Sequence, residues 1–223
     1  MYETAQSVGA ALGWIGWALS PLSALPLALV LAAALGAPLG AGLATTVSRL
    51  AHAVDQVTAF AGRVGQIAGV ALVLVIVVVV AQRYVFGISL TKLQESILYL
   101  HALVFMLGAA ATLSADAHVR VDVIYAGLSA RTKAWINLAG AYGFIVPLGV
   151  VILRVSRAYV DLAWRVGEGS AEADGLPLVF ALKTLIPVFA VLMIAQAGIM
   201  AARASLTLAG RPSDPPPAPA APV

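Results

Sequence analysis

Long runs without an ionisable side chain dominate this chain. No Asp, Glu, Lys, Arg or His occurs in residues 64–82, 102–115, 134–153 or 184–202. Each run is close to the ~20 residues that an α-helix needs to cross ~30 Å of hydrocarbon. Charged residues make up only 10% of the chain, whereas soluble domains have about 25%. In lipid, only helices and closed barrels satisfy their own backbone hydrogen bonds, so we predict an all-α integral membrane protein.

The bounds of four core spans follow from the charges that flank the apolar runs. We predict helices from Val64 to about Ala81, from Ile97 to Leu113, from Ala134 to Leu153 and from Leu178 to Ala202. The β-branched run inside the first span would favour a strand in water, but lipid favours the helix. These spans predict a four-helix transmembrane core over residues 64–206.

Residues 1–48 predict a further hydrophobic element ahead of this core. Residues 8–48 carry no charge, but they are longer than one span and contain three prolines. We predict an extra span over residues 26–47, preceded by an interfacial helix that bears Trp14 and Trp17. A hairpin of two short helices is the alternative.

Two further segments flank the core. Residues 49–63 have an amphipathic helical pattern, which predicts a helix that lies on the membrane surface. Its apolar side carries Leu50, Val54, Val57, Phe60 and Ala61, and its polar side carries Arg49, His52, Gln56 and Arg63. Residues 207–223 are rich in proline and predict a disordered, partly polyproline II tail.

Few residues are suited to catalysis or to holding a cofactor. The chain has no cysteine, which excludes disulfides and thiolate sites, and its net charge of +3 is too small to indicate nucleic-acid binding. Loop 114–122 concentrates Asp116, His118, Arg120 and Asp122. A metal site is one interpretation of this loop, and an ion-pair cluster at the membrane surface is the favoured one. We expect no catalytic residue, no cofactor and no metal.

The predicted spans have almost no ionisable side chains, and ionisable groups inside a membrane usually mark solute or proton routes. This pattern argues against transport by this chain alone. Where a proline breaks a span, the uncharged helix ends can bind a solute instead. Because of Pro147 and Pro187, an independent small carrier or channel remains the alternative hypothesis. A haem or quinone redox protein is a third hypothesis, although the histidines are poorly placed to face one another across helices. We favour helices that pack against lipid and a partner.

Charged residues near the span ends are the candidates for contact with a partner or with the membrane surface. For Glu95, the helix dipole also explains an acid near the start of a helix, so we favour an interface role for it over a catalytic one. The candidates are Arg83, Glu95, His118, Arg120, Asp122, Arg157 and Glu168.

The order of several short motifs resembles the DctQ-like small membrane subunit of tripartite ATP-independent periplasmic (TRAP) transporters. The resemblance covers about residues 63–203. Its carriers are Arg83-Tyr-Val-Phe86, Glu95, the run Gly108-Ala-Ala-Ala-Thr-Leu-Ser-Ala-Asp-Ala-His-Val-Arg-Val-Asp122, Glu168-Gly-Ser170, Gly175-Leu-Pro177 and Lys183-Thr-Leu-Ile-Pro187. Leu98, Leu103 and the extra N-terminal span depart from the usual pattern and resemble a longer branch of the family.

The resemblance implies a non-catalytic subunit in a three-part transporter for organic acids. A periplasmic binding protein would capture the acid, and a large membrane subunit would move it and bind the coupling ion, usually Na+. The small subunit would scaffold the large one and help to dock the binding protein. It would lie in the bacterial inner membrane with a cytoplasmic C-terminus, an orientation that loop charges favour by a single Lys or Arg.

Overall fold

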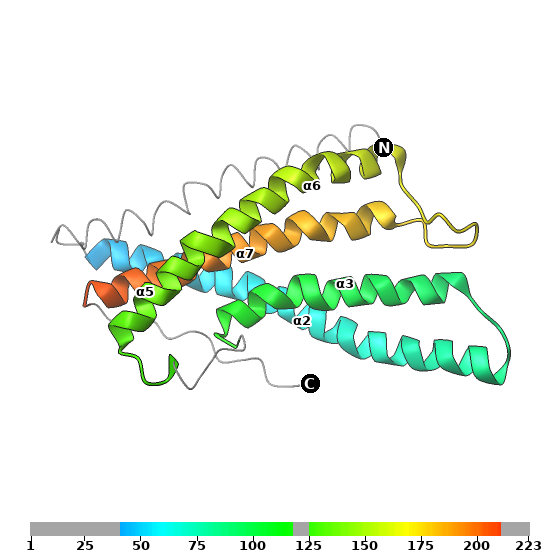
Figure 1. The fold of residues 1–223 in the computed structure, drawn as a ribbon, viewed down its shortest axis with the longest axis horizontal. Helices are drawn as coiled ribbons and strands as arrows, with labels where there is room; N and C mark the ends of the chain where they lie inside the picture. Colours follow the sequence, from blue (N-terminus) through cyan, green and yellow to red (C-terminus); the bar gives the residue numbers. More distant parts are fainter. Residues whose placement is uncertain (1–40, 118–124, 211–223) are drawn as a thin grey trace.

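The computed structural model describes residues 41–117 and 125–210 (Figure 1). The described residues are helical and contain no strand. Four helical rods are long and apolar enough to cross a membrane: Thr45–Val85, Thr91–Ser114, Ala130–Val166 and Val179–Leu208. The predicted all-α membrane class is therefore confirmed, and each predicted span lies within one rod or overlaps it.

The first rod, α2 (Ala41–Val85), is much longer than its predicted span. Residues 49–63, predicted as a helix on the membrane surface, are helical and continue directly into the span. Their position at the membrane surface stays a prediction. The side of α2 that faces the protein carries small and polar residues, including Ala51 and Thr58, whereas Val57 and Phe60 point outward. Polar partners on other helices make this inner face possible.

A tight turn joins α2 to α3 (Thr91–Ser114). Gly87 has a φ of 65° in this turn, a conformation that glycine adopts without a Cβ clash. The two helices then approach closely, because a Cβ built on Gly62 would lie 2.6 Å from the Cβ of Ala111. Small residues allow such approaches in membrane bundles, where helices pack by van der Waals contact.

The third rod consists of α5 (Ala130–Gly140), the π-helix η1 (Ala141–Ile145) and α6 (Val146–Val166). Ser129 caps its start by accepting a hydrogen bond from the Thr132 amide at 3.2 Å. The amide of Val146 bonds to the carbonyl of Ala141, which is the wide i→i+5 pattern. Pro147 follows directly in the first turn of α6. Pro147 therefore coincides with a widened turn and not with a broken helix.

The fourth rod, α7 (Val179–Leu208), is the centre of the bundle. It packs against α2, α3, α5, η1 and α6. Its buried residues are mostly small, and Ala190, Ala197 and Ala201 are fully buried. Pro187 lies inside α7 without interrupting it.

The helix ends gather into two groups (Figure 1). The Arg203 end consists of the start of α2, the ends of α3 and α7, and the start of α5. The Lys183 end consists of the α2–α3 turn and the α6–α7 loop, residues 167–178. In this loop Gly167 has a φ of 59° and caps α6, and the Glu168 amide donates to the Ala163 carbonyl at 2.9 Å.

Several predictions concern residues outside the described ranges. The predicted interfacial helix and most of the extra span fall in residues 1–40. Most of the proline-rich tail falls in residues 211–223, and part of the polar loop falls in residues 118–124. These remain predictions.

Candidate functional site

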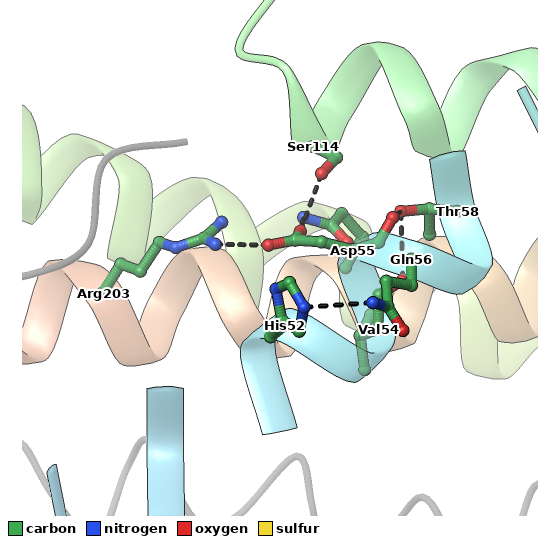
Figure 2. Close-up of polar contacts among 8 residues, drawn as sticks. His52, Val54, Asp55, Gln56, Thr58, Ser114 and Arg203 are labelled. Carbon is green, nitrogen blue, oxygen red and sulfur yellow. Dashed lines mark hydrogen bonds and ion pairs between the residues drawn. The ribbon is translucent and has the colours of Figure 1, made fainter. Parts of the chain in front are cut away.

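At the Arg203 end, one carboxylate on α2 ties three helices together (Figure 2). Asp55 accepts hydrogen bonds from the Ser114 hydroxyl at 2.7 Å and from the Gln196 amide nitrogen at 3.2 Å. It also pairs with the Arg203 guanidinium at 2.5 Å. The Asp55 and Arg203 side chains are 12% and 15% exposed. We call these four residues the Asp55 network.

The local sequence of α2 prepares this network. Thr58, one turn further along, is fully buried, and its hydroxyl donates to the carbonyls of Val54 and Asp55 at 3.1 Å. A threonine can thus occupy the inner face without an unpaired hydroxyl. On the outward face, His52 and Gln56 bond to each other at 3.0 Å. On the inner face, Asp55 therefore bonds to other helices and Thr58 bonds within α2, whereas the outward pair His52 and Gln56 bond only to each other.

A second carboxylate holds the α6–α7 loop at the Lys183 end. Glu95 accepts a hydrogen bond from the Ser170 hydroxyl and another from the Leu176 amide, the latter at 2.6 Å. A side chain at Gly175 would collide with both Ser170 and Glu95. The loop is therefore fastened to the start of α3 at a position where only glycine fits.

An ion pair beside it fastens α7 to the same loop. The Lys183 ammonium lies 2.5 Å and 2.6 Å from the two carboxylate oxygens of Glu168, and it also lies 3.8 Å from the centre of the Tyr159 ring. Trp164 donates to the Thr184 hydroxyl at 2.8 Å. Together with Glu95, this ion pair joins α3 and α7 to the α6–α7 loop. We call Glu95, Ser170, Glu168 and Lys183 the Glu95–Lys183 network.

The same end also carries an exposed ion pair. Lys92 and Asp174 lie 2.8 Å apart, with side chains that are 58% and 73% exposed. Exposed pairs contribute about 0–1 kcal/mol, whereas removal of one partner from a buried pair costs about 3–5 kcal/mol. The Asp55 network therefore matters far more for stability than Lys92–Asp174.

The seven predicted interface residues fall into three groups. Arg83 and Arg157 are exposed on α2 and α6. Glu95 and Glu168 are half-buried and bond within the chain. The other three, His118, Arg120 and Asp122, lie outside the described residues.

The sequence interpretation missed the residues of the Asp55 network. Asp55 and Arg203 are 148 positions apart, so no local spacing joins them. One signal was present: Asp55 is an acid among small and apolar residues, and Arg203 is the first charge after a bare span. Two isolated and opposite charges near the ends of spans indicate an ion pair between them.

The outward faces of the bundle are apolar. On α6 one row of exposed large residues recurs every three or four positions; it consists of Leu148, Val151, Val155, Tyr159, Leu162 and Val166. Arg154 and Arg157 are exposed on the same helix. This surface suits lipid or another membrane protein.

The residues that the structure describes include no group of three or more His, Asp or Glu placed to hold a metal ion. His101 stacks on Phe105 at a ring separation of 4.6 Å. The metal interpretation of loop 114–122 involves residues outside the described ranges and remains untested.

Comparison with known proteins adds one match. A family described as "Tripartite ATP-independent periplasmic transporters, DctQ component" matches residues 72–207, which is more than half of the chain. No curated protein and no solved structure matched. The matched stretch contains the whole Glu95–Lys183 network and all of the Asp55 network except Asp55.

Proposed function

Because the chain belongs to the DctQ component family of tripartite ATP-independent periplasmic transporters, we propose that it is a non-catalytic scaffold for the large transport subunit. Membership makes it a component of a membrane transport complex. The finer proposal is that its helices form a fixed wall against which the large subunit moves an organic acid. The coupling ion, Na+ by resemblance to the family, would bind the large subunit.

The observation that carries this proposal is the pair of polar networks at opposite ends of the bundle. The Asp55 network joins α2, α3 and α7, and the Glu95–Lys183 network joins α3 and α7 to the α6–α7 loop. Both consist of half-buried or buried groups, where hydrogen bonds to charged groups contribute about 1.5–3 kcal/mol each. A bundle fastened at both ends suits a wall that must not move with its partner.

The middle of the bundle supports the same proposal. The spans carry no ionisable residue between the two networks in residues 102–115 and 184–202. A broken helix would offer its ends to a solute, but α7 runs through Pro187 and Pro147 lies in a continuous rod. The independent-carrier alternative therefore gains no support from these prolines.

We assign the contact with the large subunit to the outward face of α6 and to the exposed end of α2. Arg157 and Arg83 are the charged candidates on these surfaces. The α6–α7 loop, with Glu172 and Asp174 exposed, is the accessible segment for a soluble binding protein. In this arrangement the Lys183 end faces the periplasm and the Arg203 end faces the cytoplasm of an inner membrane.

Co-purification and uptake together test the proposal. The full chain, tagged, is expressed with the large membrane subunit of a tripartite ATP-independent periplasmic transporter. The soluble binding protein of the same transporter is screened against carboxylic acids to find the acid used as probe. We expect a stable complex of the two membrane subunits, and uptake of that acid only by proteoliposomes that contain both. Uptake by this chain alone would overturn the scaffold proposal.

The α6 assignment has its own control. Arg157→Ala should lower recovery of the large subunit, whereas Lys92→Ala, which alters an exposed pair at the Lys183 end, should not. Equal recovery of the large subunit with both variants would show that Arg157 is not in the interface. The scaffold role itself is tested by the uptake experiment.

A further inference from the structure

One arginine on α2 faces outward without a partner. Arg63 is exposed, and it forms no hydrogen bond or ion pair with the parts of the chain that the structure describes. Its neighbours on the same side of the helix, Phe60 and Ile67, are 65% and 68% exposed. Residues three and four apart share one helix face. The Arg63 side chain therefore starts between two large apolar side chains on the outside of the bundle.

Arg63 lies within the apolar layer that the other helices define. The uncharged runs of α3, α5 and α7 all end beside one cavity at the Arg203 end, which is lined by Asp116, Lys133 and Arg203. The helix α2 passes this level at Asp55, which pairs with Arg203. Arg63 is eight residues further toward the Lys183 end. At ~1.5 Å per residue that is about 12 Å into a layer of about 30 Å.

Two contacts support this depth. Asp55 also bonds to Gln196, which belongs to the uncharged run of α7, so Asp55 already lies inward of the end of that run. Gly62, directly before Arg63, packs against Ala111 in the uncharged run of α3. A charged side chain inside the membrane is costly, and such side chains almost always face protein or a water-filled cavity. This depth differs from the surface position that the amphipathic pattern predicts for this segment.

Arg63 interrupts a row of exposed apolar residues along α2. The row repeats every three or four positions, and we call it the α2 row; it consists of Phe60, Arg63, Ile67, Val70, Leu74 and Val77. A seven-residue repeat of this kind lets helices pack at a small left-handed crossing angle, in coiled coils and in membrane bundles. Lipid alone would satisfy the apolar members of the row, but Arg63 requires an acceptor.

Charge selects the partner that covers the α2 row. A second copy of this chain would have the same orientation in the membrane, so a symmetric pairing along the row would bring two copies of Arg63 together. Residues 1–40 contain one acid, Glu3, which lies outside the uncharged run 8–48. Lipid phosphates lie beyond the level of Asp55, which is itself about 12 Å from Arg63 along the helix. A transmembrane helix of another protein that carries an acid fits the row best.

We propose that the α2 row contacts a transmembrane helix of the large subunit and that Arg63 forms an ion pair with a carboxylate on that helix. The inference rests on the scaffold function proposed above, and it specifies the surface and the chemistry of the contact. Removal of one partner of such a pair leaves an uncompensated charge away from water. Arg63 also fixes the register of the two helices, as a single polar residue does in a coiled coil.

Co-purification of the full chain with the large membrane subunit tests the ion pair. Arg63→Leu should lower recovery of the large subunit at least about tenfold, because it leaves the partner's acid unpaired. Arg49→Leu is the matched control, because Arg49 is exposed on the same helix but lies on the other side of Asp55; recovery should not change. Arg63 makes no bond within the described chain, so neither variant should lower the melting temperature of the chain alone. This readout separates a lost contact from misfolding.

Charge reversal identifies the acid on the partner. Arg63→Glu should abolish recovery, and exchange of one membrane-embedded Asp or Glu of the large subunit for Arg should restore it. Equal recovery with Arg63→Leu and Arg49→Leu, or the absence of any restoring exchange, would overturn the ion pair and leave the scaffold function standing. Loss of bound phosphatidylglycerol from Arg63→Leu in native mass spectrometry, with unchanged recovery, would assign the arginine to lipid and would also overturn it. Failure of the wild-type chain to recover the large subunit would overturn the scaffold function and the ion pair together.

Discussion

The Asp55 network makes a quantitative prediction for stability. Asp55→Ala removes the counter-ion of Arg203, which is 15% exposed, and removes the acceptor for Ser114 and for the Gln196 amide. Loss of one partner of a buried ion pair costs about 3–5 kcal/mol. For chains of this size 1 kcal/mol corresponds to about 2–4 °C in melting temperature, so we expect a fall of roughly 6–20 °C.

The assay is thermal unfolding of the full chain in one detergent, followed by the fraction that remains monodisperse on size exclusion after heating. Asp174→Ala is the matched control, because it also removes an acid from an ion pair but from one that is largely exposed. Exposed pairs contribute about 0–1 kcal/mol, so the control should shift by no more than about 4 °C. Asp55→Leu combined with Arg203→Met should recover most of the loss, because apolar replacement of a whole buried pair is often neutral or stabilising.

Two results would refute this reasoning. If Asp55→Ala and Asp174→Ala lowered the melting temperature equally, burial would not set the strength of these pairs. If the double variant were as unstable as Asp55→Ala, the loss would come from something other than an unpaired buried arginine.

Three further predictions concern packing, the loop and orientation. Gly62→Ala should cost about 1–3 kcal/mol by overpacking, whereas Gly140→Ala, where a Cβ meets nothing within 4 Å, should gain up to about 1 kcal/mol from helix propensity; melting temperatures that ranked the two variants the other way would contradict the close approach of α2 and α3. Glu95→Gln cannot accept every hydrogen bond that the carboxylate accepts, so amide exchange in loop 167–178 should accelerate about tenfold, and unchanged exchange by mass spectrometry would remove the anchor role. The chain has no cysteine, so an impermeant maleimide added outside spheroplasts should label Glu172→Cys and not Arg131→Cys; the reverse pattern would invert the proposed orientation.

The four spans were predictable because bare apolar runs of bilayer length leave few alternatives. The ends of the helices were not predictable, because the helices continue through polar residues that form hydrogen bonds inside the protein. Residues 49–63 illustrate the difficulty. Their apolar side was visible in the sequence, but periodicity does not say whether lipid or protein covers it. Val57 and Phe60 point outward, while the inner face is built around a carboxylate.

The polar networks were only partly predictable. Glu95 and Glu168 were singled out as charges at span ends, but their internal partners depend on how loop 167–178 folds back on α3. Asp55 on α2 and Arg203 on α7 are 148 positions apart and meet only where these two helices pack together. The resemblance to the DctQ-like family, by contrast, rested on ordered short motifs, and the match over residues 72–207 confirms it.

The widened turn η1 also bears on which length changes this chain tolerates. An i→i+5 turn takes in one residue more than an ordinary turn. Deletion of Gly143 would let η1 close as α-helix, and α5 and α6 would keep their present sides toward α7. The same deletion a few positions later, at Val150, would rotate everything before it by about 100° relative to the rest of α6. Homologues that differ by a single residue in the third rod should therefore gain or lose it within residues 141–145.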